Sequence, residues 1–132
     1  MKRVITFKED ERAVYEMEVP VLIHKSKFNE YLKFLEESIR EVYPEVATGR
    51  RSTIEGKREG KEVCFKLAVE DSELRATIEA WVIHRLVGDR FKVLIRVKWP
   101  RIILNPDCYR VLTREVVDLL WKSIMKWASR EV

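Results

Sequence analysis

The sequence has no glutamine, and it has only two cysteines, two histidines and four glycines among its 132 residues. The cysteines, Cys64 and Cys108, are too few and too far apart for a disulfide framework or a zinc knuckle. The histidines, His24 and His84, have no partner at a recognised metal-ligand spacing. The glycines are scattered and cannot build a phosphate-binding loop. We therefore expect a protein that needs no cofactor and holds no metal.

The residues that could catalyse a reaction also lack partners. Cys108 is expected near a helix N-terminus, which can activate a thiol, but no base is placed beside it. The acidic pairs Glu36-Glu37 and Glu70-Asp71 fall on a helix surface and in a turn, where neither looks like a general acid–base pair. These absences predict a protein that is not an enzyme.

Charged and apolar side chains are abundant: 36% of the residues are charged, 46% are hydrophobic, and four are Trp. This content and the length fit one folded domain. Many Lys, Arg and Glu with few amides is the compositional bias of hyperthermophile proteins. The N-terminal residues have no apolar signal core, and no apolar run reaches the roughly 18 residues of a spanning helix, so we expect a soluble, cytoplasmic protein.

Positive charge is unevenly distributed along a chain whose net charge is +4. Residues 49–66 and 89–101 carry an excess of Lys and Arg, whereas residues 1–48 and 67–88 carry a small excess of acids. Two short basic segments indicate a basic patch that faces a polyanion more than a general cationic coat.

Strands are predicted where apolar residues alternate with other residues. In Tyr15–Ile23 the alternation is regular, but Pro20 removes one ladder donor and so predicts an edge strand or a bulge. A turn at Glu59-Gly60 would set Ile54 opposite Phe65. The expected strands are 3–7, 15–23, 50–58, 61–70 and a last strand that Pro100 ends.

Two long helices are predicted from apolar residues on one face. Ser26 opens the first, and Pro44 ends it. Asn105-Pro106-Asp107 is a start signal for the second, Cys108–Arg130. The apolar arc of the second helix covers roughly 240°, where a one-sided surface helix needs little more than 100°. Its second partner, besides the sheet, could be the first helix, the N-terminal hairpin or another copy of the chain. A homo-oligomer would use Val117, Trp121, Met125 and Ala128.

The stretch Leu74–Val87 fits either a helix or a strand. As a helix it would be capped by Ser72 and end at Gly88, and residues 73–76 are good helix formers. The run Trp81-Val82-Ile83 instead prefers a strand. This choice decides the fold.

The strand alternative gives a consistent sheet. With two-residue turns at Asp71-Ser72 and Gly88-Asp89, apolar residues face apolar residues at every junction, and a slip of one residue would break the pattern. His84 then lies on the apolar face, where a buried and hydrogen-bonded histidine is expected. The predicted fold is α+β: an antiparallel sheet of four long strands plus an N-terminal hairpin, with both helices on one face. The predicted pairs include Val69–Leu74, Phe65–Ile78, Trp81–Arg96, Val82–Ile95, Ile83–Leu94 and Leu86–Phe91.

The outer face of this sheet would combine cations with apolar residues. Single-stranded nucleic acid needs both, an aromatic or apolar surface for its bases and cations for its phosphates. Glu55, Glu62 and Glu79 share the far edge of the face. Alternatively, Lys and Arg stems cover Trp81, or another subunit covers the face. The predicted nucleic-acid-binding residues are Trp81, Ile83, Leu94, Lys66, Arg75, Arg85, Arg90, Lys92, Arg96 and Lys98.

The layout of Arg50–Trp99 resembles that of ThermoDBP-type proteins of hyperthermophilic archaea. The resemblance rests on arrangement and composition. It implies an archaeal, thermophilic protein that binds single-stranded nucleic acid without an OB-fold, in an apolar cleft between basic ridges. Trp81, Ile83 and Leu94 would then contact bases. The phosphates would be contacted by Arg85, Lys92, Arg96 and Lys98.

On the helix alternative, Val63–Leu86 resembles the strand–helix end of the small dimerising subunit of the KEOPS tRNA-modification complex. The stretch AVEDSELRA carries most of this likeness. That family normally ends near this helix, whereas here a strand and a long helix follow.

Three functional hypotheses follow from the sequence. The first is binding of single-stranded DNA or RNA, largely independent of base sequence, by a dimer that has no catalytic activity. The second is a non-catalytic dimerising subunit of a tRNA-modification complex. The third is a small lipophilic ligand bound on the concave apolar side of the sheet.

Overall fold

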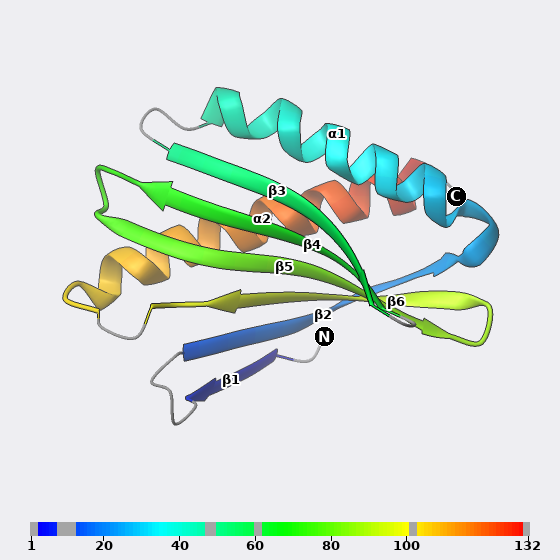
Figure 1. Cartoon of the computed structure of the whole chain (residues 1–132), viewed down its shortest axis with the longest axis horizontal. Coiled ribbons are helices and arrows are strands. Elements are labelled where there is room, and N and C mark those ends of the chain that lie inside the picture. The colour runs from blue at the N-terminus through cyan, green and yellow to red at the C-terminus, as the bar shows by residue number, and fades with distance from the viewer. Residues whose placement is uncertain (1–2, 8–12, 47–49, 60–61, 101–102, 131–132) are drawn as a thin grey trace.

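In the computed structural model, the backbone is described for residues 3–7, 13–46, 50–59, 62–100 and 103–130, and the side chains for 15–41, 63–100 and 103–130. Six strands form one sheet, and two long helices lie on the same side of it (Figure 1). The elements are β1 (Arg3–Phe7), β2 (Ala13–His24), the 3-10 turn η1 (Lys25–Lys27), α1 (Phe28–Val46), β3 (Arg50–Glu59), β4 (Glu62–Asp71), β5 (Ala76–Val87), β6 (Arg90–Lys98) and α2 (Pro106–Arg130).

The sheet has the strand order β1-β2-β6-β5-β4-β3, and every neighbouring pair is antiparallel. Strands β3 to β6 form a meander, and β2 pairs with the last strand of that meander. Buried side chains from the strands and from both helices join in one core. The predicted α+β class is confirmed: four long antiparallel strands and an N-terminal hairpin, with both helices on one face.

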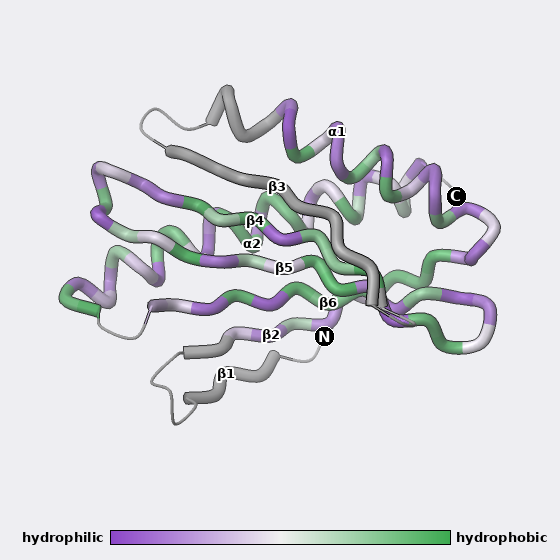
Figure 2. The backbone as a smooth tube through the Cα atoms, in the orientation of Figure 1, coloured by the Kyte–Doolittle hydropathy of each residue, from purple (hydrophilic) through white to green (hydrophobic). Residues whose placement is uncertain are grey.

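The ambiguous stretch forms a strand, so the helix alternative is wrong. Ala76, Ile78, Ala80 and Val82 are buried in β5, whereas the residues between them are more exposed. Figure 2 shows the same alternation of hydrophobic and hydrophilic residues along β5 and β6. The alternation has the period of a strand, and the β-branched residues of 82–83 favour an extended backbone.

The predicted two-residue turn at Asp71-Ser72 is also wrong. Asp71 pairs with Ala76, so residues 72–75 form a wider turn and Val69 faces Ile78. The Asp71 carboxylate accepts hydrogen bonds from the backbone N–H groups of Glu73 (3.0 Å) and Leu74 (3.1 Å). These local bonds stabilise the wider turn. The pairing moves by four residues, and because four is even, each side chain keeps its predicted face.

The hairpin of β3 and β4 shows a smaller displacement. Ile54 faces Leu67 and not the predicted Phe65, because Glu59 pairs with Glu62. The predicted turn residue Gly60 lies outside the described residues. The shift is again even, so it leaves the faces unchanged.

The predicted pairs between β5 and β6 are confirmed. Trp81 faces Arg96, Val82 faces Ile95 and Leu86 faces Phe91. The turn between these strands contains Gly88, whose φ of 66° is a left-handed conformation that glycine adopts without strain. The predicted two-residue turn at Gly88-Asp89 therefore gives the observed register of β5 and β6.

Pro20 lies in a bulge of β2, in a part of the strand that is not paired with β1. Strand β2 is flanked by β1 and β6, and its register with β6 shifts between Val19 and Leu22. Pro20 and Val21 have no partner in β6, so the missing N–H of Pro20 costs no ladder bond there. Of the two sequence alternatives for this proline, the bulge is confirmed.

Helix α2 has two partners within its own chain, the sheet and α1. The Trp127 ring lies 5.8 Å from the Tyr31 ring between centroids, and the Ser38 hydroxyl donates to the Ser123 hydroxyl at 3.4 Å. Helix α1 continues past Pro44 to Val46, so its predicted end is wrong. Pro44 lacks the N–H that would bond to the carbonyl four residues before it, and the helix ends two residues later.

This packing changes the predicted oligomer interface. Val117 is only 6% exposed and belongs to the core, so its side chain is not available to a second copy. Trp121 and Met125 pack in part against the same core, and Ala128 is half-buried. A homo-oligomer through these three residues stays a prediction. In the described part of the chain, no helix combines the length and apolar character needed to cross a bilayer.

Candidate functional site

The outward residues of β4, β5 and β6 line up in rows across the sheet, because antiparallel register sets them opposite one another. Rows lie two residues apart along each strand, or about 7 Å. The apolar row consists of Cys64, Ile83 and Leu94. The Trp81 row on one side consists of Lys66, Trp81 and Arg96, and the Lys92 row on the other side includes Arg85 and Lys92.

The apolar row is partly closed by its own neighbours. Ile83 is only 3% exposed, although it lies on the face opposite the helices and outside the main core. Leu94 and Cys64, which flank it, are half-buried. The predicted direct contact of Ile83 with a base is therefore wrong, since its side chain has almost no accessible surface. Within the apolar row, Ile83 packs beneath its neighbours, and Leu94 is partly accessible to a ligand.

Lysine side chains cover Trp81, which is the alternative that the sequence left open. The Lys66 ammonium lies 5.8 Å from the Trp81 ring centroid, and the Lys98 ammonium lies 5.3 Å from it. A cation over an indole ring is worth about 0.5–1 kcal/mol at an exposed site. A base that stacks on Trp81 would have to displace these lysines.

Acidic residues neutralise the cations around the Trp81 row. The Glu16 carboxylate accepts from Arg96 Nε and Nη2, both at 2.9 Å, and Glu79 lies 3.8 Å from the Lys66 ammonium. Strand β2 also sets Glu18 opposite Leu94. The sequence did not reveal Glu16 and Glu18 as members of this face, because the pairing of β2 with β6 joins strands far apart in the chain.

The hairpin end of the face has the opposite character. We use "hairpin end" for the outward residues near the β5–β6 turn. Arg85, Arg90 and Lys92 are exposed there, and among the described residues neither Arg90 nor Lys92 forms an ion pair. Leu22 lies opposite Lys92 and is 55% exposed, and Val87 lies opposite Arg90 and is 54% exposed. The alternation along β2 and β5 carried the signal for both apolar residues, which were not predicted as site residues.

Arg75 does not belong to this face. It lies in the β4–β5 turn with a φ of 53°, at the other end of the sheet, so its predicted role beside Trp81 is wrong. The Asn105 side-chain amide donates to the Leu74 carbonyl at 2.8 Å and ties this turn to the start of α2. The side chains of Glu55 and Glu62, expected at the far edge, lie outside the described residues.

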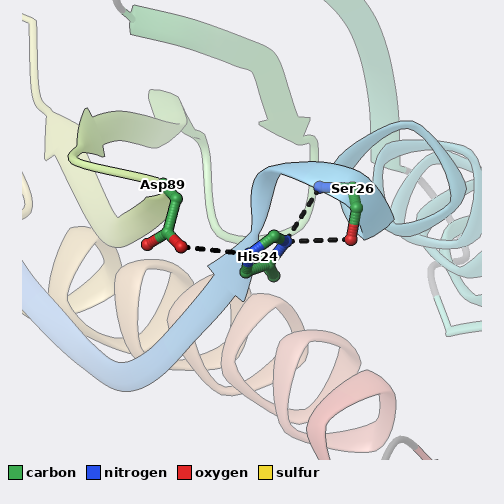
Figure 3. A network of polar contacts seen from close by, with 3 residues as sticks. All are labelled: His24, Ser26 and Asp89. Atoms are coloured by element: carbon green, nitrogen blue, oxygen red, sulfur yellow. Dashed lines mark hydrogen bonds and ion pairs between the residues drawn. The ribbon is translucent and has the colours of Figure 1, made fainter.

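Three polar residues meet at the hairpin end, where β2 passes into α1 (Figure 3). His24 Nδ1 accepts from the Ser26 backbone N–H (3.1 Å) and lies 2.8 Å from the Ser26 hydroxyl, while Nε2 lies 3.2 Å from the Asp89 carboxylate. A serine, a histidine and an aspartate in line are also the parts of a hydrolase triad. Here the Ser26 amide is bonded to His24, and the Lys25 amide is bonded to the Asp89 carbonyl at 2.8 Å, so neither can stabilise an oxyanion. The network therefore caps the 3-10 turn η1, which leads into α1, and anchors the β5–β6 turn.

His84 is buried on the core face, as predicted. Its Nε2 lies 2.8 Å from the Tyr31 hydroxyl, and its Nδ1 lies 2.9 Å from the Val63 carbonyl. A neutral ring that donates from Nδ1 and accepts at Nε2 satisfies both bonds. Burial lowers the pKa of His84 to about 4, and the bond to Val63 opposes this shift in part. Burial also raises the pKa of Tyr31.

The chain was compared with protein-family models, curated proteins and solved structures, and none of the three comparisons gave a match. The resemblance to ThermoDBP-type proteins rests on arrangement and composition alone and stays a prediction. The resemblance to the KEOPS subunit depends on a helix over a stretch that forms β5.

Proposed function

We propose that the outer face of the sheet binds single-stranded nucleic acid, largely independent of base sequence, and that the protein acts by binding and not by catalysis. One observation supports this proposal most: Leu94, a partly exposed residue of the apolar row, lies between two rows that carry cations. Bases need an apolar surface, phosphates need cations, and the spacing of about 7 Å between rows lets one strand reach both. We further propose that the protein acts in the cytoplasm, and that it does so as a homo-oligomer.

The other two hypotheses have less support from the geometry. A lipophilic ligand on the apolar side of the sheet would have to share that side with both helices, and Leu67, Ile95 and Leu120 there are fully buried. The subunit hypothesis predicts stable co-purification with a larger enzyme and weak nucleic-acid binding by the protein alone.

Fluorescence anisotropy with a short single strand and its matched duplex, each at two salt concentrations, tests the proposal. We expect the single strand to bind more tightly, with an affinity that falls as salt rises. Leu94→Glu should weaken binding, since it places a negative charge on the apolar row. Val111→Glu is the matched control, because Val111 is exposed on α2. A flat response of the wild-type protein at both salt concentrations would contradict the proposal.

A further inference from the structure

The two ends of the outer face differ in how their cations are used. We use "Trp81 end" for the outward residues around Trp81, away from the β5–β6 turn. There Arg96 is bonded to Glu16, Lys66 lies near Glu79, and the Lys98 ammonium lies over the indole. Each of these cations already has a partner in its own chain. A phosphate that approached them would have to compete with a carboxylate or an aromatic ring.

The cations of the hairpin end are more exposed than those around Trp81. Arg90 and Lys92 are exposed, and no ion pair of either is found in the described part of the chain. The acids nearest in register are Asp89, whose carboxylate faces His24, and Glu62, which lies opposite Arg85. A phosphate can therefore pair with Lys92 and Arg90 without first breaking a bond within the protein.

Apolar residues stand directly beside these cations. Leu22 faces Lys92 across the β2–β6 ladder, Val87 faces Arg90 across the β5–β6 ladder, and more than half of each apolar side chain is accessible. Exposed apolar side chains interleaved with Lys and Arg provide both kinds of contact that a single strand needs. The hairpin and the β2–α1 connection lie at the same end of the molecule (Figure 1).

The acids of β2 restrict where a polyanion can cross that strand. Glu16 lies at the β2 end of the Trp81 row, and Glu18 lies at the β2 end of the apolar row. In the next row along β2 the residue is Leu22. Like charges repel, so a phosphate backbone that crosses β2 is directed away from Glu16 and Glu18 and over Leu22.

We propose, on the basis of the function proposed above, that the phosphates of a bound single strand contact the hairpin end through Arg90 and Lys92. The sugars and bases lie on Leu22, Val87 and Leu94. The Trp81 row is then a charge-paired border of the site and not its phosphate-binding part. The site thus has a direction on the sheet, with its open end at the β5–β6 turn.

Two charge reversals on one strand test this direction. Lys92 and Lys98 are the same residue type, lie on β6 and point to the same face, but they lie at opposite ends of it. Lys92→Glu should lower affinity for a single strand roughly tenfold at low salt and reduce the salt slope by about 0.7, the value for one lost contact to a single strand. Lys98→Glu should change affinity less than about twofold. Circular dichroism and a melting curve confirm that each variant is folded.

The results separate this inference from the proposed function. No binding of any oligonucleotide to the wild-type protein overturns both. Binding that Lys92→Glu and Lys98→Glu weaken equally, or that Lys98→Glu weakens more, overturns the direction alone.

Leu22→Ser with Val87→Ser provides a second measurement, expected to weaken binding without changing the salt slope, since no charge is lost. A parallel sedimentation assay uses vesicles of anionic phospholipid. If Lys92→Glu abolishes vesicle binding and leaves oligonucleotide binding intact, the partner is a membrane surface and the inference is wrong.

Discussion

The two faces of β5 and β6 share one backbone but differ in what surrounds their side chains. On the inner face Val93, Ile95 and Val97 are fully buried beneath the helices, and His84 is held by two hydrogen bonds. On the outer face the residues between them, such as Leu94 and Arg96, keep part of their surface accessible. Successive residues of one strand therefore have different roles. Inner residues determine the stability of the fold, and outer residues can be changed for binding with little loss of stability.

The difference between the two faces is tested most directly by shortening two neighbouring side chains of one strand, one on each face. Ile95→Ala should lower the free energy of unfolding by about 2–5 kcal/mol, because it leaves a cavity beneath the helices. Leu94→Ala should cost about 1 kcal/mol or less, because solvent and mobile side chains can fill the space it leaves. Denaturant unfolding of both variants measures the two losses. Equal losses would mean that a layer not seen in the monomer, such as a second copy of the chain, covers the outer face.

The sequence predicts these faces better than it predicts the pairing of residues. The alternation along β4, β5 and β6 assigns inner and outer side chains correctly, because an error of an even number of residues leaves the face of a side chain unchanged. The register itself depends on the turn. Gly88 indicates its turn in the sequence, whereas the turn after Asp71 is four residues long and is stabilised by bonds to the Asp71 side chain.

The candidate site could be predicted only in part, for a topological reason. The rows of β5 and β6 come from one local hairpin, so Trp81, Arg96, Lys92 and Leu94 are correctly brought together. Glu16 belongs to the site through β2, a strand distant in sequence, and no local pattern predicts that β2 pairs with β6. Burial of Ile83 also depends on three strands at once, so the sequence overestimated its access to a ligand.

The inner face should also respond to acid. The folded-state pKa of His84, about 4, lies below the unfolded value of 6.5, so the folded protein binds fewer protons between these values. The stabilisation is fully present above pH 6.5 and is lost as the pH falls toward 4. It amounts to about 3 kcal/mol from this one group. Unfolding measured from pH 7 to pH 4 checks the slope.

An NMR titration assigns this acid response to one residue. The His84 imidazole should stay neutral from pH 7 down to about pH 5, since it is buried and both its nitrogens are hydrogen-bonded. His24→Gln is the control, because His24 lies on the exposed hairpin end and its removal should leave the response of the inner face in place. Protonation of His84 near pH 6.5 would contradict the burial of this side chain.

The smallest expected effect tests whether the Trp81 end is closed. Glu16 and Arg96 form an ion pair whose side chains are 28% and 32% exposed, so their coupling should be modest, about 0.5–1 kcal/mol, and weaker at high salt. A double-mutant cycle with Glu16→Ala and Arg96→Ala measures this coupling free energy from unfolding curves. If the pair is a border of the site, a saturating single-stranded oligonucleotide should leave the coupling unchanged. A coupling that vanishes when the oligonucleotide binds would show that phosphate takes Arg96 from Glu16, and the two ends of the outer face would then be equivalent.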